Sequence, residues 1–187
     1  MWGNIMPENI IIENCSPTLA GIKTGNLFSI DTAIVKDVHE ELRELNGILS
    51  SKGLRAIPLK ITDKKILIYL YRPKRLQADL ESAEAKNILL QKGYRCSSIE
   101  EYIVNLIRHI HEDDCFPHEI GLFLGYPPVD VKGFMEDTRK GVKCTGYWKV
   151  YGDKEKAEKT FSRYKKCTDI YKKSFANGKR LSQMIVA

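Results

Sequence analysis

Apolar and polar positions follow regular periods along most of the chain, and these periods predict the secondary structure. From residue 31 the apolar positions recur at the period of an α-helix, and Lys52-Gly53 then supplies a stop signal. The members of this stripe are Ile34, Val35, Val38, Leu42, Leu45 and Leu49. The pattern predicts an amphipathic helix that ends before residue 53.

Two short segments rich in branched and aromatic residues follow, at 54–61 and 65–71, separated by Thr62-Asp63-Lys64. This arrangement is typical of a β-hairpin or of two neighbouring strands. The second segment is apolar throughout from Ile66 to Tyr71. A continuous apolar run predicts a central strand that is covered on both faces.

Three longer helices are predicted in the rest of the chain. The first covers 73–91 with a break near Leu80, and the second covers 98–112, where Ser98 and Glu101 have the spacing of a capping box. The third begins after Asp153 as its N-cap and ends at Asn177-Gly178.

Shorter elements are predicted around the prolines. Ser16-Pro17 indicates a helix start, with an end near 24–26, and Pro117 and Pro128 each begin a short helix. Ile120, Leu124, Gly125 and Val131 match the packing of a helix-turn-helix-like corner over 117–137. Segments 147–151 and 181–186 are expected to be strands.

Together these elements predict an α/β or α+β fold in one domain over residues 1–187. The predicted sheet has about three to five strands, built from 54–61, 66–71, 147–151 and the carboxyl terminus, and helices cover it. A chain of 187 residues that is 43% apolar and 29% charged fits one globular domain rather than a disordered segment.

The sequence shows no apolar run long enough to span a membrane and no secretory signal. It has five widely scattered cysteines, at positions 15, 96, 115, 144 and 167. An odd number of cysteines in a chain of this size favours free thiols and a reducing compartment. We therefore expect a cytoplasmic protein.

The formal net charge of +6 comes from one segment, because residues 153–180 hold ten Lys or Arg against four Asp or Glu. The basic side chains on the outer face of this helix are Lys156, Lys159, Arg163, Lys166 and Lys173. The aromatic residues lie on the opposite, core-facing stripe and are not placed to stack on bases. Nucleic acid is disfavoured as a partner, also because the second helix of the corner carries Asp130, Glu136 and Asp137.

A thiol nucleophile is the first candidate for chemistry. Cys15 directly precedes the helix predicted from Ser16, where a helix N-terminus lowers the pKa of a thiol. His118 would be the base, and Asn26 or Glu119 would orient it. The structural alternative is a buried Cys15 that packs as a small apolar residue.

A metal site is the second candidate. His109, His111, Cys115 and His118 crowd into ten residues together with Glu112, Asp113 and Asp114. Although Cys115 and His118 have a spacing that zinc could use, no second pair of ligands completes a structural site. We therefore predict no metal site, and no cofactor fingerprint is present.

Three segments carry a resemblance, namely 15–28 (CSPTLAGIKTGNLF), 116–134 (FPHEIGLFLGYPPVDVKGF) and 146–153 (GYWKVYGD). They resemble the signature blocks of an uncharacterised family, a domain of unknown function that occurs mainly in anaerobic Gram-positive bacteria. The resemblance implies no activity, cofactor or catalytic residue. Cys15 and His118 lie inside the blocks, whereas His109, His111 and Cys115 lie outside them.

Our leading hypothesis is that segments 15–26 and 116–128 converge on one pocket that binds a small ligand or supports thiol chemistry. The expected contributors are Cys15 and His118 as catalytic residues and Lys23, Thr24, Asn26 and Glu119 as ligand-binding residues. The alternative is a non-catalytic adaptor or regulatory protein, in which the helix-turn-helix-like corner and the basic carboxyl-terminal helix form a surface for protein or nucleic acid. The sequence leaves open whether the protein is an enzyme.

Overall fold

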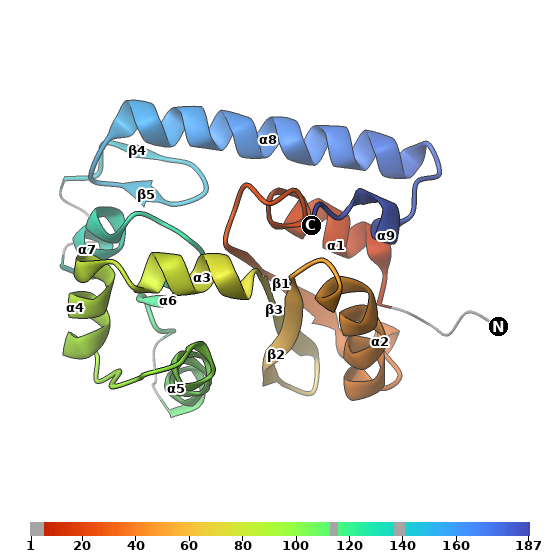
Figure 1. The fold of residues 1–187 in the computed structure, drawn as a ribbon, viewed down its shortest axis with the longest axis horizontal. Helices are drawn as coiled ribbons and strands as arrows, with labels where there is room; N and C mark the ends of the chain where they lie inside the picture. Colours follow the sequence, from red (N-terminus) through yellow and green to blue (C-terminus); the bar gives the residue numbers. More distant parts are fainter. Residues whose placement is uncertain (1–5, 113–115, 137–140) are drawn as a thin grey trace. The chain divides into compact units, whose positions relative to one another are not determined.

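The fold is α+β and is described here by a computed structural model, which covers residues 6–112, 116–136 and 141–187 (Figure 1). Contacts divide the chain into two compact units. Unit 1 comprises residues 1–73 and 164–187, and unit 2 comprises residues 74–163. That both units belong to one domain stays a prediction.

Unit 1 contains an antiparallel sheet of three strands in the order β1-β3-β2. The strands are β1 (Gly25–Asp31), β2 (Arg55–Ile61) and β3 (Lys65–Tyr71). Gly25 and Arg55 both pair with Tyr71, so β3 lies between the other two strands. The predicted hairpin and its central second strand are confirmed.

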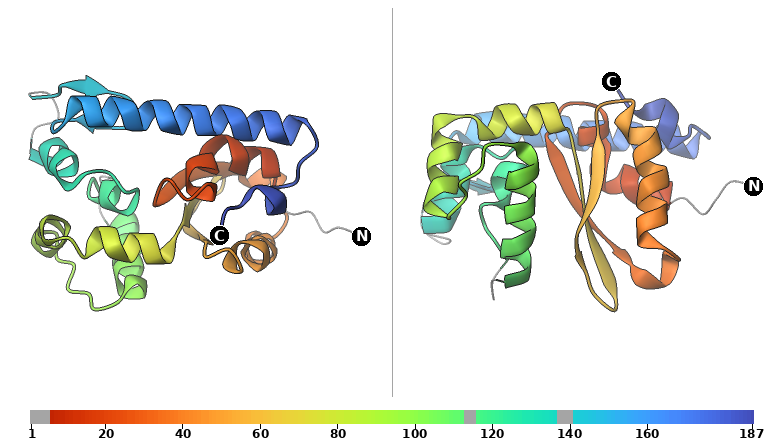
Figure 2. Two further views of the ribbon diagram at one scale, coloured as in Figure 1. Left: turned by 45° about the horizontal axis from the view of Figure 1, so that its top comes forward. Right: turned by 60° about the horizontal axis from the view of Figure 1, so that its bottom comes forward.

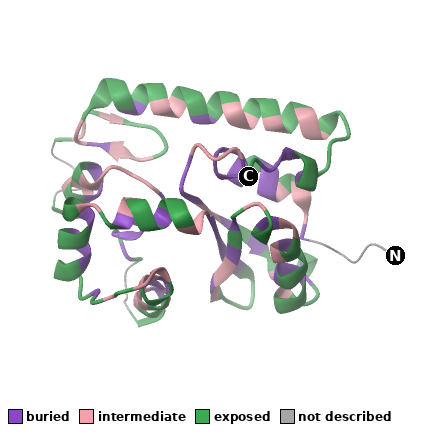
Figure 3. Cartoon of the chain, in the orientation of Figure 1, coloured by how far each residue is buried: buried purple, intermediate pink, exposed green. Residues whose placement is uncertain are grey.

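Helices pack against this sheet. The main ones are α1 (Glu8–Leu19), which contacts β1, and α2 (Val38–Ser50), which contacts β2, as the right-hand view of Figure 2 shows for α2. Asp37 caps α2 through its carboxylate, which accepts hydrogen bonds from the N–H groups of His39 and Glu40. A short 3-10 helix, η1 (Thr32–Ile34), follows β1. Buried residues gather along α1 and the strands, where the core of unit 1 lies (Figure 3).

The amino-terminal helix differs from the prediction. α1 begins at Glu8, not at Ser16, and Pro17 lies inside it. The helix forms earlier because Ile11, Ile12, Cys15 and Leu19 recur at helical spacing and all become buried. Pro17 has no N–H and therefore removes one backbone hydrogen bond from the helix. At the end of the helix, Arg72 donates to the carbonyls of Thr18 and Leu19 at 2.8 and 2.9 Å.

The composition of the sheet was also predicted incorrectly. Its third strand is β1, whereas residues 149–150 form a separate two-stranded ladder of β4 (Cys144–Thr145) and β5 (Lys149–Val150). The carboxyl-terminal segment forms a short helix, α9 (Leu181–Met184), rather than a strand. Leu181 and Met184 are both buried, and a spacing of three suits a helical turn.

Unit 2 is mainly helical. It contains α3 (Pro73–Leu80), α4 (Ala83–Gln91), α5 (Ile99–Glu112), α6 (Ile120–Phe123) and α7 (Pro128–Glu136), together with β4 and β5. The predicted break after Leu80 is confirmed, and Ser82 caps α4. The inward residues Ile103, Leu106 and Ile110 of α5 are buried, as its apolar stripe predicts.

The last long helix, α8 (Lys154–Ala176), is confirmed with its predicted ends. The Asp153 carboxylate accepts a hydrogen bond from the N–H of Lys156 at 3.0 Å, which is N-cap geometry. The five basic residues predicted for its outer face are exposed. No helix within the described ranges is long and apolar enough to cross a membrane.

Candidate functional site

A cavity of about 350 Å³ lies in unit 2, bordered by α6, α7, β4, β5 and the segments next to them. Aromatic rings supply much of its wall, from Phe116, Tyr126, Phe134, Tyr147 and Trp148. Aliphatic residues on α6 and α7 add to this apolar surface, chiefly Ile120 and Val131. A concave apolar site of this size is typical of pockets that hold small molecules.

Two of the rings form a stacked pair at the wall. The rings of Tyr126 and Trp148 lie 4.7 Å apart between centroids, with an angle of 28° between their planes. The Tyr126 hydroxyl also donates a hydrogen bond to the carbonyl of Tyr147 at 3.2 Å. Trp148 also meets Phe161 of α8 edge-on, with centroids 4.6 Å apart. These contacts restrain the orientation of the Trp148 indole.

Asp130 holds this wall in place. Its carboxylate is almost completely buried and accepts hydrogen bonds from Trp148 Nε1 at 2.7 Å, Tyr151 N at 2.8 Å and Gly152 N at 2.7 Å. It therefore joins α7 to the segment that carries the aromatic residues. The sequence pattern did not reveal this role, because Asp130 was interpreted only as an acidic residue of the second helix. Its place in the first turn of a helix that begins with proline was the available signal.

The turn between α6 and α7 depends on two glycines. Gly125 has φ of +75°, a conformation that other residues rarely adopt. A Cβ on Gly121 would lie 2.8 Å from Cγ2 of Val131, so only glycine lets the two helices approach this closely. The predicted corner residues Ile120, Leu124 and Val131 are buried. The functional comparison with a helix-turn-helix stays a prediction.

His118 and Lys149 bring polar chemistry to the apolar wall. His118 is exposed and meets the Phe134 ring edge-on, with centroids 4.8 Å apart. The Lys149 ammonium lies 5.1 Å from the centroid of the same Phe134 ring. Both residues line the cavity, as does Thr145. The Thr145 hydroxyl, the His118 imidazole and the Lys149 ammonium thus line a mainly aromatic cavity.

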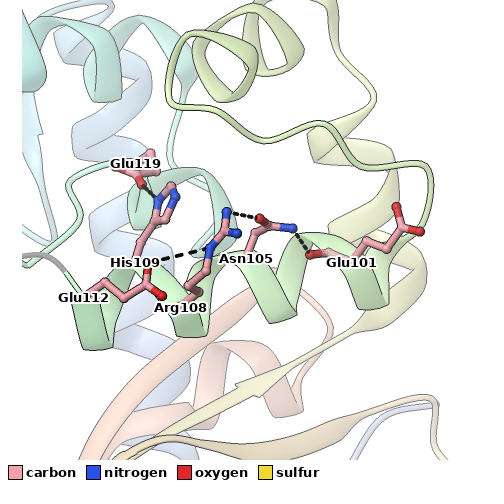
Figure 4. Close-up of polar contacts among 6 residues, drawn as sticks. All are labelled: Glu101, Asn105, Arg108, His109, Glu112 and Glu119. Carbon is pink, nitrogen blue, oxygen red and sulfur yellow. Dashed lines mark hydrogen bonds and ion pairs between the residues drawn. The ribbon is translucent and has the colours of Figure 1, made fainter.

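Glu119 follows His118 in the sequence but points toward α5 (Figure 4). Its buried carboxylate accepts a hydrogen bond from the Tyr94 hydroxyl at 3.1 Å and lies 3.0 Å from His109 Nδ1. Glu119 is not among the residues that line the cavity. Its contacts anchor the start of α6 to α5, and its predicted role in ligand binding stays a prediction.

In unit 1, Cys15 is completely buried and lies four residues before the end of α1. The premise that it precedes a helix N-terminus is therefore wrong. Burial raises the pKa of its thiol strongly, and the nearby Lys23 charge opposes this only in part. A thiol in this environment carries little thiolate at neutral pH.

The other predicted residues of unit 1 form an internal polar network. The Lys23 ammonium donates to the carbonyl of Gly25 at 2.8 Å, and burial lowers the pKa of this lysine to about 8. The Thr18 hydroxyl donates to Oδ1 of Asn26 at 2.7 Å. Thr24 is also buried. These side chains stabilise the connection between α1 and β1.

The structure thus brings Cys15 and Lys23 together in unit 1 and places His118 in unit 2. The Cys15–His118 dyad, and the shared pocket of segments 15–26 and 116–128, would join the two units and stay predictions.

No group of three or more His, Cys, Asp or Glu side chains within the described ranges is placed to hold a metal ion. His109, one of the candidate ligands, has Nδ1 next to Glu119. Asp113, Asp114 and Cys115 lie outside the described residues.

A second cavity of about 240 Å³ lies in unit 2 beside α3, α4 and the start of α5. Its wall is more polar and includes Glu81, Lys86 and Cys96. Burial and the nearby Glu101 raise the pKa of the Cys96 thiol, so this cysteine is not activated either. The aromatic cavity is therefore the stronger candidate.

The fold and site define a mixed α+β protein with an aromatic cavity suited in size to a small molecule. The family model described as "Protein of unknown function (DUF3793)" matches residues 11–185, and the chain belongs to this family. No curated protein matches the chain, and no solved structure matches it. Membership of an uncharacterised family is therefore confirmed, and it assigns no activity; bacterial origin stays an expectation.

Proposed function

We propose that this protein binds a small ligand in the aromatic cavity of unit 2. The observation that carries the proposal is the cavity itself, with a volume of about 350 Å³ and walls of aromatic and aliphatic side chains. Apolar walls with a few polar groups are the usual composition of a ligand pocket, because burial supplies affinity and polar contacts supply orientation.

The way in which the walls are held supports the proposal. Asp130 fixes the segment that carries Trp148 and Tyr151 through three hydrogen bonds, and Gly121 allows α6 to lie directly on α7. A site whose walls are already fixed loses less conformational entropy when a ligand binds. The fixed walls therefore favour the interpretation of the cavity as a ligand-binding site rather than as a packing defect.

Thiol catalysis is not needed for this function. A buried Cys15 with a raised thiol pKa is a weak nucleophile, and the side chains of Lys23 and Asn26 form hydrogen bonds within unit 1. We keep a cytoplasmic location as part of the proposal, supported by free thiols at Cys15, Cys96, Cys144 and Cys167. Fractionation of cells that produce the protein tests the location.

The test of ligand binding uses Trp148 as a reporter. The sequence has two tryptophans, so Trp2→Phe leaves a single indole, whose N–H donates to Asp130 at the cavity wall. Aromatic fragments are screened by the change in the Trp148 indole signal in ¹H–¹⁵N spectra and by the melting temperature. We expect several fragments to shift both, because the cavity is preformed.

A blocking variant shows whether these fragments occupy the cavity. Thr145→Phe places a ring at the wall, whereas Thr160→Phe makes the same change on α8, away from the cavity. We expect the first variant to lose at least about tenfold in fragment affinity and the second to retain it. If no fragment shifts the Trp148 signal, or if both variants bind equally well, the cavity is not a binding site.

A further inference from the structure

The polar groups of the aromatic cavity specify the kind of ligand that it accepts. We infer that the ligand is a planar aromatic acid, whose rings lie against the aromatic wall and whose carboxylate meets Lys149. This inference rests on the proposed function and names the ligand class for the same cavity.

The shape of the wall favours a planar ligand. Tyr126 and Trp148 are stacked on each other, and Phe134 presents its ring to both His118 and Lys149. Phe116 and Tyr147 complete the aromatic surface and remain substantially exposed, at 47% and 41%. Rings bind rings by offset stacking or edge-to-face contact, so a flat aromatic group matches this wall better than a branched aliphatic group.

The carboxylate of Asp130 is already occupied by the protein. One oxygen accepts from Tyr151 N and Gly152 N, and the other accepts from Trp148 Nε1. With three donors in place, little capacity remains for hydrogen bonds from a ligand. A ligand rich in donors, or one with an ammonium group, therefore finds no strong acceptor at this residue.

The remaining polar groups of the wall can all act as donors. They are the ammonium of Lys149, the hydroxyls of Thr145, Tyr126 and Tyr147, and the imidazole of His118. Lys149 lies 5.1 Å from the Phe134 centroid, which keeps its charge beside the apolar surface. A cation at the edge of an aromatic wall attracts a ligand anion, and charge-assisted hydrogen bonds are stronger than neutral ones. The same cation repels a positively charged ligand.

The experiment compares three ligands that share one ring system. They are naphthalene-2-carboxylate, its neutral carboxamide, and the cationic naphthalen-2-ylmethylammonium. Affinities for the full chain are measured by calorimetry, and the Trp148 indole signal shows whether each compound reaches the cavity. We expect the carboxylate to bind about tenfold more tightly than the carboxamide, and the ammonium compound to bind most weakly.

Variants of Lys149 test the source of this preference. Lys149→Gln removes the charge and should bring the carboxylate to within twofold of the carboxamide, whereas Lys149→Arg should keep the preference. Lys132→Gln makes the same change of charge at an exposed site on α7 that does not line the cavity, and should change neither affinity.

The outcomes separate the two proposals. If the three compounds bind with equal affinity, or the ammonium compound binds most tightly, the cavity binds ligands but the aromatic-acid assignment is wrong. The assignment is also wrong if Lys149→Gln leaves the preference for the carboxylate intact. If none of the three compounds and none of the screened fragments shifts the Trp148 indole signal, ligand binding by this cavity is itself refuted.

Discussion

Segments 15–26 and 116–134 contain similar ingredients, with prolines, glycines and reactive side chains close together, but they use them differently. In the first, Thr18, Lys23 and Thr24 are at most 2% exposed, and the side chains of Thr18 and Lys23 donate hydrogen bonds within unit 1. In the second, His118 is exposed and Phe116 is half-exposed beside a cavity. The first segment stabilises a fold, and the second forms a surface that a ligand can reach.

The difference shows that residue type alone does not distinguish a site from a structural network. Lysine, threonine and asparagine near a glycine turn are equally suited to binding a ligand and to satisfying buried backbone groups. Burial and partners decide between the two. Changes in segment 15–26 should therefore affect stability or accessibility, whereas changes around segment 116–134 should also affect ligand binding.

The largest expected effect concerns the reactivity of Cys15. Because its thiol is buried and its pKa is raised, iodoacetamide can reach it only when unit 1 opens. At neutral pH we expect Cys15 to be labelled at least about a thousandfold more slowly than the partly exposed Cys144, as an opening free energy of about 4 kcal/mol implies. Mass spectrometry of peptides measures the two rates in the same sample.

Chemical denaturation provides the control, since Cys15 and Cys144 should then react at similar rates. If native Cys15 is labelled as fast as Cys144, its structural role is contradicted, and the hypothesis that Cys15 is a thiol nucleophile is favoured again.

The second effect is on the stability of unit 2. Asp130→Ala leaves three N–H donors without their acceptor, so we expect the free energy of unfolding to fall by about 3 kcal/mol. Unfolding in urea is followed by the fluorescence of Trp148 in the Trp2→Phe background. The affinity for aromatic fragments should fall as well, because the segment that carries Trp148 loses its anchor.

Asp153→Ala is the matched control. Asp153 caps α8 by accepting a hydrogen bond from Lys156 N, and it is not among the residues that line the cavity. Loss of this cap should lower the free energy of unfolding by about 1 kcal/mol and leave fragment affinity unchanged. Equal losses in the two variants would mean that Asp130 does not organise the site.

Much of the fold could be predicted because long amphipathic helices carry their own signals. The stripes of α2 and α5 and the capping residues of α8 are local, and the structure confirms them. β1 was missed because only two of its large apolar residues, Phe28 and Ile30, are buried. The segment forms a strand through its pairing with β3, about forty residues later in the chain. The start of α1 was misplaced because Ser16-Pro17 has the residue types of a helix N-terminus.

The site could be predicted only in part, for a similar reason. Segment 116–134 stood out by its prolines and glycines, and His118 does line the cavity. Asp130 and Trp148 could not be paired from the sequence, because their hydrogen bond links residues on different elements. Residues 147–151 had been assigned to a strand of the main sheet, which concealed the place of Tyr147, Trp148 and Lys149 in the cavity wall.

The third effect is a dependence of stability on pH that comes from Lys23. Burial lowers its pKa from 10.5 to about 8, so between these values the unfolded chain binds more protons than the folded protein. Stability therefore rises with pH in this window, and the cost of the buried charge is fully present below about pH 8. From pH 7 to 9 we expect the wild type to gain about 1 kcal/mol relative to Lys23→Met.

Urea unfolding at several pH values measures this gain, and stopping at pH 9 limits the contribution of cysteine ionisation in the unfolded chain. Lys92→Met, at an exposed position, should show no such dependence relative to the wild type. A flat difference between the wild type and Lys23→Met would indicate that Lys23 is solvated, and segment 15–26 would then be open like segment 116–134.

The smallest effect on stability is expected at His118, where the two segments differ most clearly. His118 is exposed, so His118→Ala should change the free energy of unfolding by less than about 0.5 kcal/mol. The imidazole nevertheless forms part of the cavity wall beside Phe134, so the affinity for naphthalene-2-carboxylate should fall about threefold with the loss of a ring contact. His39→Ala, at an exposed position of α2 in unit 1, should change neither quantity. His118→Phe separates the two contributions of the ring, because it retains aromatic contact but removes the N–H donor. A loss of stability above about 1 kcal/mol in His118→Ala, without a change in affinity, would place His118 in a structural network and remove the contrast with Lys23.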